Sequence, residues 1–201
     1  AEVMGKDPIE FRLELLKRAK ENPVGKNNEY DADRYAEVLK LVKEKSGWGS
    51  AENKQYSRGV AAYFCHNSYA AHVVDIVKKD GQPFVERVTS AVDCGIVINP
   101  DAAANMVQGC VVDGIGNALY GELTFKEGVP EKNNFTRYRM IRHREAPKKI
   151  DVHFVQNDIN PTGLGEPPFP PIFAAVANAL YKSEKKRFYN QPFSTELQKK
   201  L

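Results

Sequence analysis

The sequence lacks the features that mark several large classes of protein. No apolar run approaches the roughly 20 residues that a membrane-spanning helix needs. The only cysteines, Cys65, Cys94 and Cys110, form no C-x-x-C motif, which argues against an iron–sulfur cluster, a zinc site or a disulfide framework. We interpret them as small buried hydrophobic residues. The net charge of +3 is too small to indicate a nucleic-acid-binding surface.

What the chain does contain is the composition of a globular protein. Of its 201 residues, 42% are hydrophobic and 27% are charged, which is ordinary for a folded domain with a substantial core. The four histidines, His66, His72, His143 and His153, show no metal-ligand spacing, so we expect structural roles for them. The first residues carry no signal peptide and lead directly into a helical pattern, so we expect a piece of a longer chain.

Two helices are expected at the start. Asp7 can cap a helix whose first residue is Pro8, and Ile9, Leu13 and Leu16 follow at helical spacing. A second helix is expected from about Asp31 to Ser46-Gly47, after a polar linker at residues 21–30. We therefore divide the chain into a helical lead-in segment, residues 1–50, and one domain, residues 51–201.

Short β-like runs follow from residue 58. Residues 59–66 and 70–95 predict an antiparallel meander with a hairpin turn at Asp80-Gly81. Further elements are expected in this order: a helix from Asn99 to about Tyr120, a turn-rich loop at 126–134, strands at 135–141 and 150–156, and a helix at 171–182. The pattern predicts an α+β fold with an antiparallel or mixed sheet packed against helices.

The expected helix at 99–120 is unusually rich in glycine. Gly109, Gly114, Gly116 and Gly121 each cost a helix about 1 kcal/mol relative to alanine, so a close approach to the backbone is expected to offset them. Two explanations are open. The glycines allow another helix to pack tightly, or they form a surface against which a cofactor or a partner subunit lies.

The stretch NPTGLGEPPFPP, residues 160–171, sets one carboxylate, Glu166, between glycines and prolines. The third glycine position of a dinucleotide-binding loop falls on Pro168, and the four prolines remove N–H donors that a phosphate would need. Proline also pushes the preceding residue, Glu166, towards an extended conformation. A carboxylate on a stiff backbone suits a general base. The other explanation is an exposed loop acid before a helix.

Two long motifs resemble a known family. Residues 92–119, VDCGIVINPDAAANMVQGCVVDGIGNAL, and residues 163–180, GLGEPPFPPIFAAVANAL, resemble the C-terminal part of the molybdenum-binding subunits of the xanthine dehydrogenase and aldehyde oxidase family. The resemblance is to the branch of the isoquinoline 1-oxidoreductase β subunit and similar bacterial molybdenum hydroxylases. Shorter stretches such as GKDPIEFRLELL, RGVAAYF and KKRFYNQPF fit in the same order, so nearly the whole chain is covered.

The resemblance implies a role for residues 160–171. In that family, a molybdenum ion held by a pterin dinucleotide hydroxylates aldehydes or N-heterocycles with oxygen derived from water. The glutamate of the Gly-x-Gly-Glu-Pro motif, here Glu166, acts as the general base, and the backbone at Leu164 and Gly165 would lie beside the ligands of the metal. The protein then contributes placement and proton transfer, while the metal carries the redox chemistry.

The resemblance also implies a setting. The fold would be the second molybdenum-cofactor-binding domain of such an enzyme. The cofactor would be a molybdopterin cytosine dinucleotide, and no side chain of this chain would be a ligand of its metal. The partners would be the rest of the large subunit and a small iron–sulfur subunit. The location would be the periplasmic side of a bacterial membrane, with the cytoplasm as the alternative.

Two departures from the family pattern leave a second hypothesis open. The family commonly has Gln-x-Glu-Gly at the start of the glycine-rich helix, whereas this chain has Met106 to Gly109, so Met106 is assigned no pterin contact. The preceding molybdenum domain is absent from these 201 residues, so we expect the isolated chain to bind no complete cofactor and to be inactive. The second hypothesis is a non-catalytic binding module. If Glu166 is not the general base, the alternative acids are Asp113 and Glu122, which lie on or after the glycine-rich helix.

Overall fold

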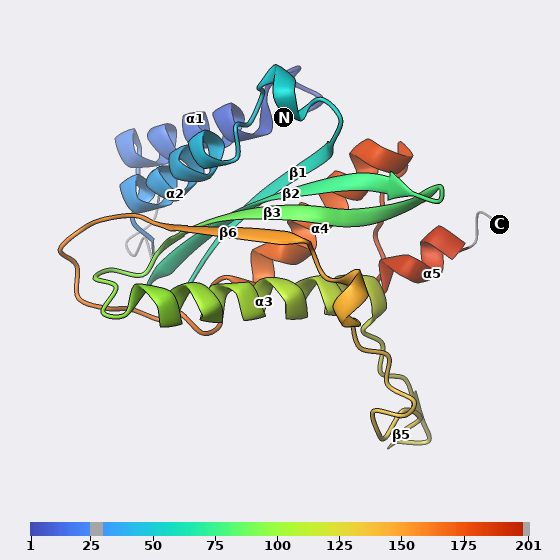
Figure 1. Cartoon of the computed structure of the whole chain (residues 1–201). Helices are drawn as coiled ribbons and strands as arrows, with labels where there is room; N and C mark the ends of the chain where they lie inside the picture. Colours follow the sequence, from blue (N-terminus) through green and yellow to red (C-terminus); the bar gives the residue numbers. More distant parts are fainter. Residues whose placement is uncertain (25–29, 199–201) are drawn as a thin grey trace.

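A four-stranded sheet with helices on both faces forms the body of the protein in the computed structural model, which describes residues 1–24 and 30–198 (Figure 1). The strands, in spatial order, are β1 (Ser57–Cys65), β2 (Ser68–Lys79), β3 (Gln82–Asp93) and β6 (Lys149–Phe154). The first three form an antiparallel meander, and β6 runs parallel to β3. The predicted α+β fold with a mixed sheet is confirmed.

Both hairpins of the meander use two-residue turns. Asp80 and Gly81, between β2 and β3, have φ values of 50° and 76°, and His66 and Asn67, between β1 and β2, have φ values of 50° and 58°. Positive φ at both central residues is typical of the turn that matches the twist of a hairpin. The predicted turn at Asp80-Gly81 is confirmed. The second turn places His66 at the tip of the β1–β2 hairpin.

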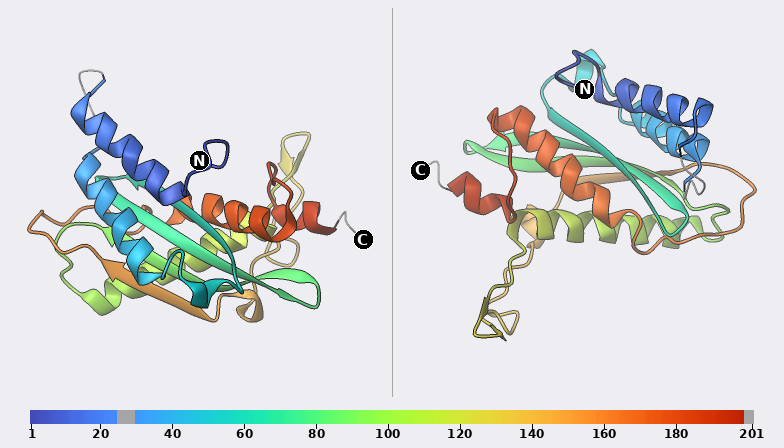
Figure 2. Two further views of the ribbon diagram at one scale, coloured as in Figure 1. Left: turned by 90° about the horizontal axis from the view of Figure 1, so that it is seen from above. Right: turned by 180° about the vertical axis from the view of Figure 1, so that it is seen from behind.

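The two leading helices, α1 (Pro8–Glu21) and α2 (Ala32–Lys45), are confirmed. The side chains of Asp7 and Asp31 cap them by accepting backbone N–H bonds. Both helices lie on one face of the sheet (Figure 2). Their packing residues form one core cluster with the sheet: Ile9, Leu16, Val38, Leu39, Val42, Val60, Tyr69, Ala71, Val73 and Ala91. Residues 25–29 of the predicted linker lie outside the described residues.

The helices predicted at 99–120 and 171–182 are present as α3 (Pro100–Tyr120) and α4 (Phe169–Glu184), and they cover the opposite face of the sheet. A short helix, α5 (Phe193–Gln198), was not predicted. Strand β2 is consequently buried on both sides, since Tyr69 and Val73 pack against α1 and α2 whereas Val74 and Ile76 pack against α3 and α4. Within the described residues, no helix has both the length and the apolar character to span a bilayer.

Close packing explains two of the three glycines within α3, while the fourth glycine, Gly121, is the residue that ends the helix. A Cβ atom added to Gly114 would lie 1.9 Å from Cγ2 of Ile172 on α4, and one added to Gly116 would lie 2.9 Å from Cγ2 of Ile141. Gly109 is different, because a Cβ atom there would meet nothing within 4 Å. The first explanation, packing of another helix, therefore holds for Gly114. Gly116 instead admits Ile141 from an irregular segment, and Gly109 leaves one position on the outer surface of α3 without a side chain.

A matched pair of substitutions on α3 tests this packing. Gly114→Ala should destabilise the protein by about 1–3 kcal/mol, because the new methyl group overpacks the contact with Ile172. Gly109→Ala should stabilise it by up to about 1 kcal/mol through helix propensity. Urea unfolding followed by circular dichroism measures both. Equal effects of the two substitutions would show that α3 and α4 are not in close contact at Gly114.

The predicted strand at residues 135–141 is wrong. The segment consists of turns and irregular backbone, and it belongs to an arm that projects away from the sheet (Figure 1). The arm contains a small hairpin of β4 (Phe125–Lys126) and β5 (Val129–Pro130), where a loop was predicted. The apolar residues that suggested a strand find no sheet to pair with, and Phe135 is 73% exposed. A strand needs a hydrogen-bonding neighbour, which sequence pattern alone does not supply.

Candidate active site

The loop between β6 and α4, residues 155–168, passes beside the tip of the β1–β2 hairpin. The N–H of Thr162 donates to the carbonyl of Cys94 at 2.9 Å, and the N–H of Gly163 donates to the carbonyl of His66 at 3.2 Å. The hydroxyl of Ser68 lies 2.6 Å from that of Thr162 and donates to the carbonyl of Gly163. Because a Cβ atom at Gly163 would lie 2.7 Å from that of His66, only glycine allows this approach.

A buried carboxylate, Asp93, ties the start of this loop to the sheet. Asp93 accepts two hydrogen bonds from the guanidinium of Arg34, at 2.9 and 2.7 Å, and further bonds from Asn157 and from the N–H of Gly95. Burial alone would raise the pKa of Asp93, but the hydrogen bonds from Arg34, Asn157 and Gly95 outweigh it and lower the pKa below its usual value. The carboxylate is therefore ionised and connects α2, β3 and the loop.

Glu166 combines a held backbone with a free side chain. Its carbonyl accepts the N–H of Phe169 at 2.8 Å, which closes a turn around Pro167 and Pro168, and both prolines are buried. Its side chain is 79% exposed and lies 2.8 Å from Nε2 of His66. An ionised carboxylate only accepts hydrogen bonds, so Nε2 of His66 is the donor. The carboxylate is thus presented to the outside from a fixed turn.

The two residues before Glu166 are held by different contacts. Leu164 is half-buried and packs against the cluster that contains Ala70, Val92, Cys94 and Val107. The carbonyl of Gly165 accepts a bond from the thiol of Cys110 on α3, at 2.8 Å. Gly165 is exposed, and the nearest atom to a Cβ added there would be the sulfur of Met106, at 3.9 Å.

Three consecutive backbone donors of this loop have no partner in the described part of the chain. Among the residues that the structure describes, the N–H groups of Leu164, Gly165 and Glu166 donate to no protein atom. Successive free N–H groups are a common binding arrangement for anionic or oxygen-rich groups. The loop therefore combines an exposed carboxylate with three backbone N–H groups that bond to no other described residue.

The cysteines near the loop are thiols. Burial raises the pKa of Cys65, and the carboxylate of Glu166 raises it further; burial and Asp113 do the same for Cys110. Both are only half-buried, so the prediction that all three cysteines are buried is correct for Cys94 alone. Across residues 1–24 and 30–198, no group of three His, Cys, Asp or Glu side chains could hold a metal ion.

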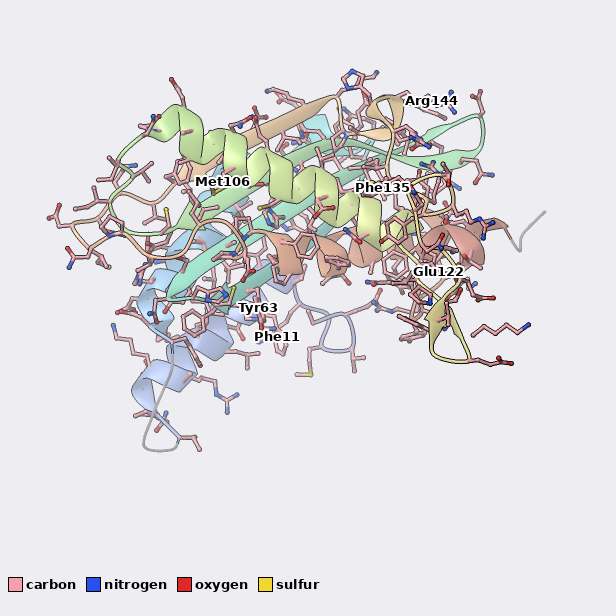
Figure 3. The ribbon with its side chains drawn as sticks, turned by 90° about the horizontal axis from the view of Figure 1, so that it is seen from below. Phe11, Tyr63, Met106, Glu122, Phe135 and Arg144 are labelled. Atoms are coloured by element: carbon pink, nitrogen blue, oxygen red, sulfur yellow. The ribbon has the colours of Figure 1, made fainter. Side chains whose placement is uncertain are left out.

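The two alternative acids lie apart from this loop or are engaged elsewhere. Asp113 bonds to Asn117 one turn later on α3, and Glu122 pairs with Lys132. Figure 3 shows Glu122 at the opposite end of α3 from Met106, the neighbour of Gly165. With a rise of 1.5 Å per residue, the helix extends about 21 Å from Met106 to its last residue, Tyr120. Glu122 is therefore too distant to act together with the 164–166 backbone.

Sequence reasoning missed the residues that surround Glu166. The structure brings His66, Ser68 and Cys110 to the loop, from positions 55 to 100 residues away in the chain. The one available signal was His66-Asn67, a turn-like pair between two β-like runs. Nothing in the spacing connected that turn to residues 160–168.

Residues 9–147 match the family model described as the molybdopterin cofactor-binding domain. The chain is 27% identical over 195 residues to the membrane-bound aldehyde dehydrogenase [pyrroloquinoline-quinone] of Gluconacetobacter polyoxogenes, covering 93% of this chain and 25% of that protein. It is 29% identical over 180 residues to isoquinoline 1-oxidoreductase subunit beta of Brevundimonas diminuta, covering 87% and 21%. The chain thus spans a quarter or less of the length of these relatives.

Solved structures with a similar fold include two oxidoreductases. Quinoline 2-oxidoreductase from Pseudomonas putida 86 superposes with a TM-score of 0.55 at 20% identity, over 66% of this chain and 18% of that one. The aldehyde oxidoreductase from Desulfovibrio gigas gives a TM-score of 0.55 at 24% identity, over 62% and 14%. At these identities the likeness concerns the fold.

Proposed function

This chain belongs to the molybdopterin cofactor-binding domain family, among the molybdenum-binding subunits related to xanthine dehydrogenase and aldehyde oxidoreductase, and from that membership we propose that Glu166 is the general base of a molybdenum hydroxylase. The substrate class is an aldehyde or an N-heterocycle. The observation that carries the proposal is the exposed carboxylate of Glu166 on a turn whose backbone is held on both sides.

The residues of the loop fit the cofactor that the family binds. Among the described residues, the N–H groups of Leu164, Gly165 and Glu166 have no protein partner, and Gly165 has no side chain to block an approach. These donors suit the oxygen-rich surface of a molybdenum cofactor that brings its own metal ligands. When bound, that cofactor supplies the oxygen that is transferred and takes up the electron pair.

The part of this chain in the reaction is to hold and move a proton. Glu166 accepts the proton at a carboxylate oxygen, and its other oxygen stays within hydrogen-bond reach of His66. The turn closed by Glu166 and Phe169 keeps the carboxylate in place. The N–H groups of residues 164–166, which donate to no other described residue, would help to hold the cofactor beside Glu166. Proton transfer by a positioned carboxylate of this kind contributes about 10²–10⁴-fold to a rate.

We propose the same setting as the resemblance implies. Residues 51–201 form the C-terminal molybdopterin-binding domain of a larger subunit, preceded by the helical segment 1–50. The partners are the rest of that subunit and a small iron–sulfur subunit. The cofactor is the cytosine dinucleotide form, and the enzyme acts on the periplasmic side. The alternative, a non-catalytic binding module, is favoured by Met106, which stands where the family commonly has glutamine.

The isolated 201-residue chain should contain far less than one molybdenum atom per chain. The reason is that the chain matches a quarter or less of its relatives, so most contacts to the cofactor would come from elsewhere. Elemental analysis of the chain, purified from a host that makes the cofactor, measures the ratio. The matched control is a full-length relative purified from the same host. A ratio near one in the isolated chain would show that this domain binds the cofactor alone.

A further inference from the structure

A buried histidine contacts the turn that carries Glu166. His72 lies in the middle of β2 and is fully buried. Its Nδ1 lies 2.8 Å from the hydroxyl of Ser90 on β3, and its Nε2 lies 2.7 Å from the carbonyl of Pro168. Both ring nitrogens therefore have a partner, and the two partners belong to different parts of the fold.

The chemistry of the partners fixes the protonation of the ring. A carbonyl oxygen only accepts hydrogen bonds, so Nε2 of His72 carries a hydrogen and donates it to Pro168. Burial lowers the pKa of His72 to about 4, although the bond to Pro168 opposes this. The ring is consequently neutral at neutral pH, and Nδ1 accepts the hydroxyl hydrogen of Ser90.

The position of Pro168 makes this bond important for Glu166. Pro168 is the residue before α4, and that end of the helix has no side-chain cap. It also lies inside the turn that the carbonyl of Glu166 closes with the N–H of Phe169. A bond to the carbonyl of Pro168 therefore fixes a turn that the usual capping interactions do not hold.

The segment 163–168 is in this way attached at both ends to the same hairpin. Gly163 is bound by the carbonyl of His66 and the hydroxyl of Ser68, and Pro168 is bound by His72. Residues 66, 68 and 72 belong to the turn and the second strand of the β1–β2 hairpin. Glu166 projects from between the two attachment points.

We propose that His72 is a positioning residue for Glu166, holding the carbonyl of Pro168 with Nε2–H so that the turn presents the carboxylate in one place. The consequence of this bond for catalysis rests on the proposed role of Glu166 as the base, whereas the effect of His72 on the turn is independent of that role.

The test uses two variants of the 201-residue chain. His72→Gln can place an amide donor close to the position of Nε2–H, whereas His72→Met is similar in length and has no donor. In the unchanged chain, ¹⁵N spectra of the histidine rings should show His72 as the neutral Nε2–H tautomer at pH 7. In His72→Met, the amide of Phe169 should exchange about tenfold faster, as expected for the loss of one buried hydrogen bond. His72→Gln should retain most of the protection.

Controls separate a local effect from general loss of stability. The amides of Val74 and Val88 lie in the core of the sheet. The ratio of their exchange rates should be the same in both variants as in the unchanged chain. An Nδ1–H tautomer or an imidazolium at pH 7 in the unchanged chain would overturn the proposal, even if His72→Met does not fold. Equal exchange at Phe169 in all three proteins would also overturn it.

In the complete enzyme, His72→Met should lower kcat and His72→Gln should restore most of it. If Glu166→Gln leaves turnover intact while the exchange results hold, the role of Glu166 as base fails and the role of His72 in the turn stands. If the exchange results fail while Glu166→Gln abolishes turnover, the inference about His72 fails alone.

Discussion

Glu166→Gln should reduce turnover per molybdenum by about 10²–10⁴-fold in the full-length enzyme that contains this chain. The amide of glutamine has nearly the shape of the carboxylate and can still bond to His66, but it cannot take up a proton. Cofactor content should be unchanged, because the side chain of Glu166 is exposed and the turn is held through the backbone. Turnover of an aldehyde or N-heterocycle, normalised to measured molybdenum, is the quantity to compare.

Two matched variants show whether the effect is specific to Glu166. Glu122→Gln and Asp113→Asn remove the charge of the two alternative acids, which bond to Lys132 and Asn117 respectively. Both variants should retain turnover close to that of the unchanged enzyme. Near-normal turnover in Glu166→Gln, or a large loss only in one of these two variants, would refute the assignment of the base and would favour the non-catalytic module.

Asp93→Asn should destabilise the fold by about 3–5 kcal/mol, the usual cost of leaving a buried charge without its partner. The side chain of Asp93 is 1% exposed and accepts two bonds from Arg34, whose guanidinium would remain. Urea unfolding at pH 7 measures the loss. The control is Asp33→Asn, which breaks an exposed pair with Lys20 and should cost about 0–1 kcal/mol. Equal losses would show that Asp93 is not a buried anchor.

The destabilisation should also depend on pH in a definite direction. The pKa of Asp93 is lowered in the folded protein, since hydrogen bonds from Arg34 and its other partners outweigh burial. Its contribution to stability is therefore fully present above the unfolded pKa, near 4, and is lost as the pH falls through the folded value. The difference in unfolding free energy between the unchanged chain and Asp93→Asn should shrink below about pH 4. A difference that stays constant into acid would contradict this account.

Local signals in the sequence predicted the helices and the meander well. Asp7 before Pro8, Asp31 before the second apolar repeat, and Asp80-Gly81 between two β-like runs each act within a few residues, and the structure contains the cap or turn that each implies. The failure at residues 135–141 has the opposite cause. Their apolar pattern is that of a strand, but whether a strand forms depends on a neighbour in space, and the arm that holds Phe135 has none.

The site divides in the same way. Glu166, Leu164 and Gly165 lie in one motif, so sequence could put them forward together as candidates, and their roles remain proposals. His66 and His72 reach the loop from about 100 residues away, through contacts that exist only after the hairpin has packed against it. Neither histidine has a metal-type spacing or a local motif. The expectation that the histidines have structural roles agrees with the buried, hydrogen-bonded ring of His72. It gave no indication that His66 contacts Glu166.

The measurement that tests the central claim most directly is the location of molybdenum in the loaded, full-length enzyme by anomalous X-ray scattering. The account predicts a metal peak beside the 164–166 backbone, near enough for the carboxylate of Glu166 to take a proton from a group bound to the metal. A metal peak on another face of the domain, out of reach of Glu166, would contradict it.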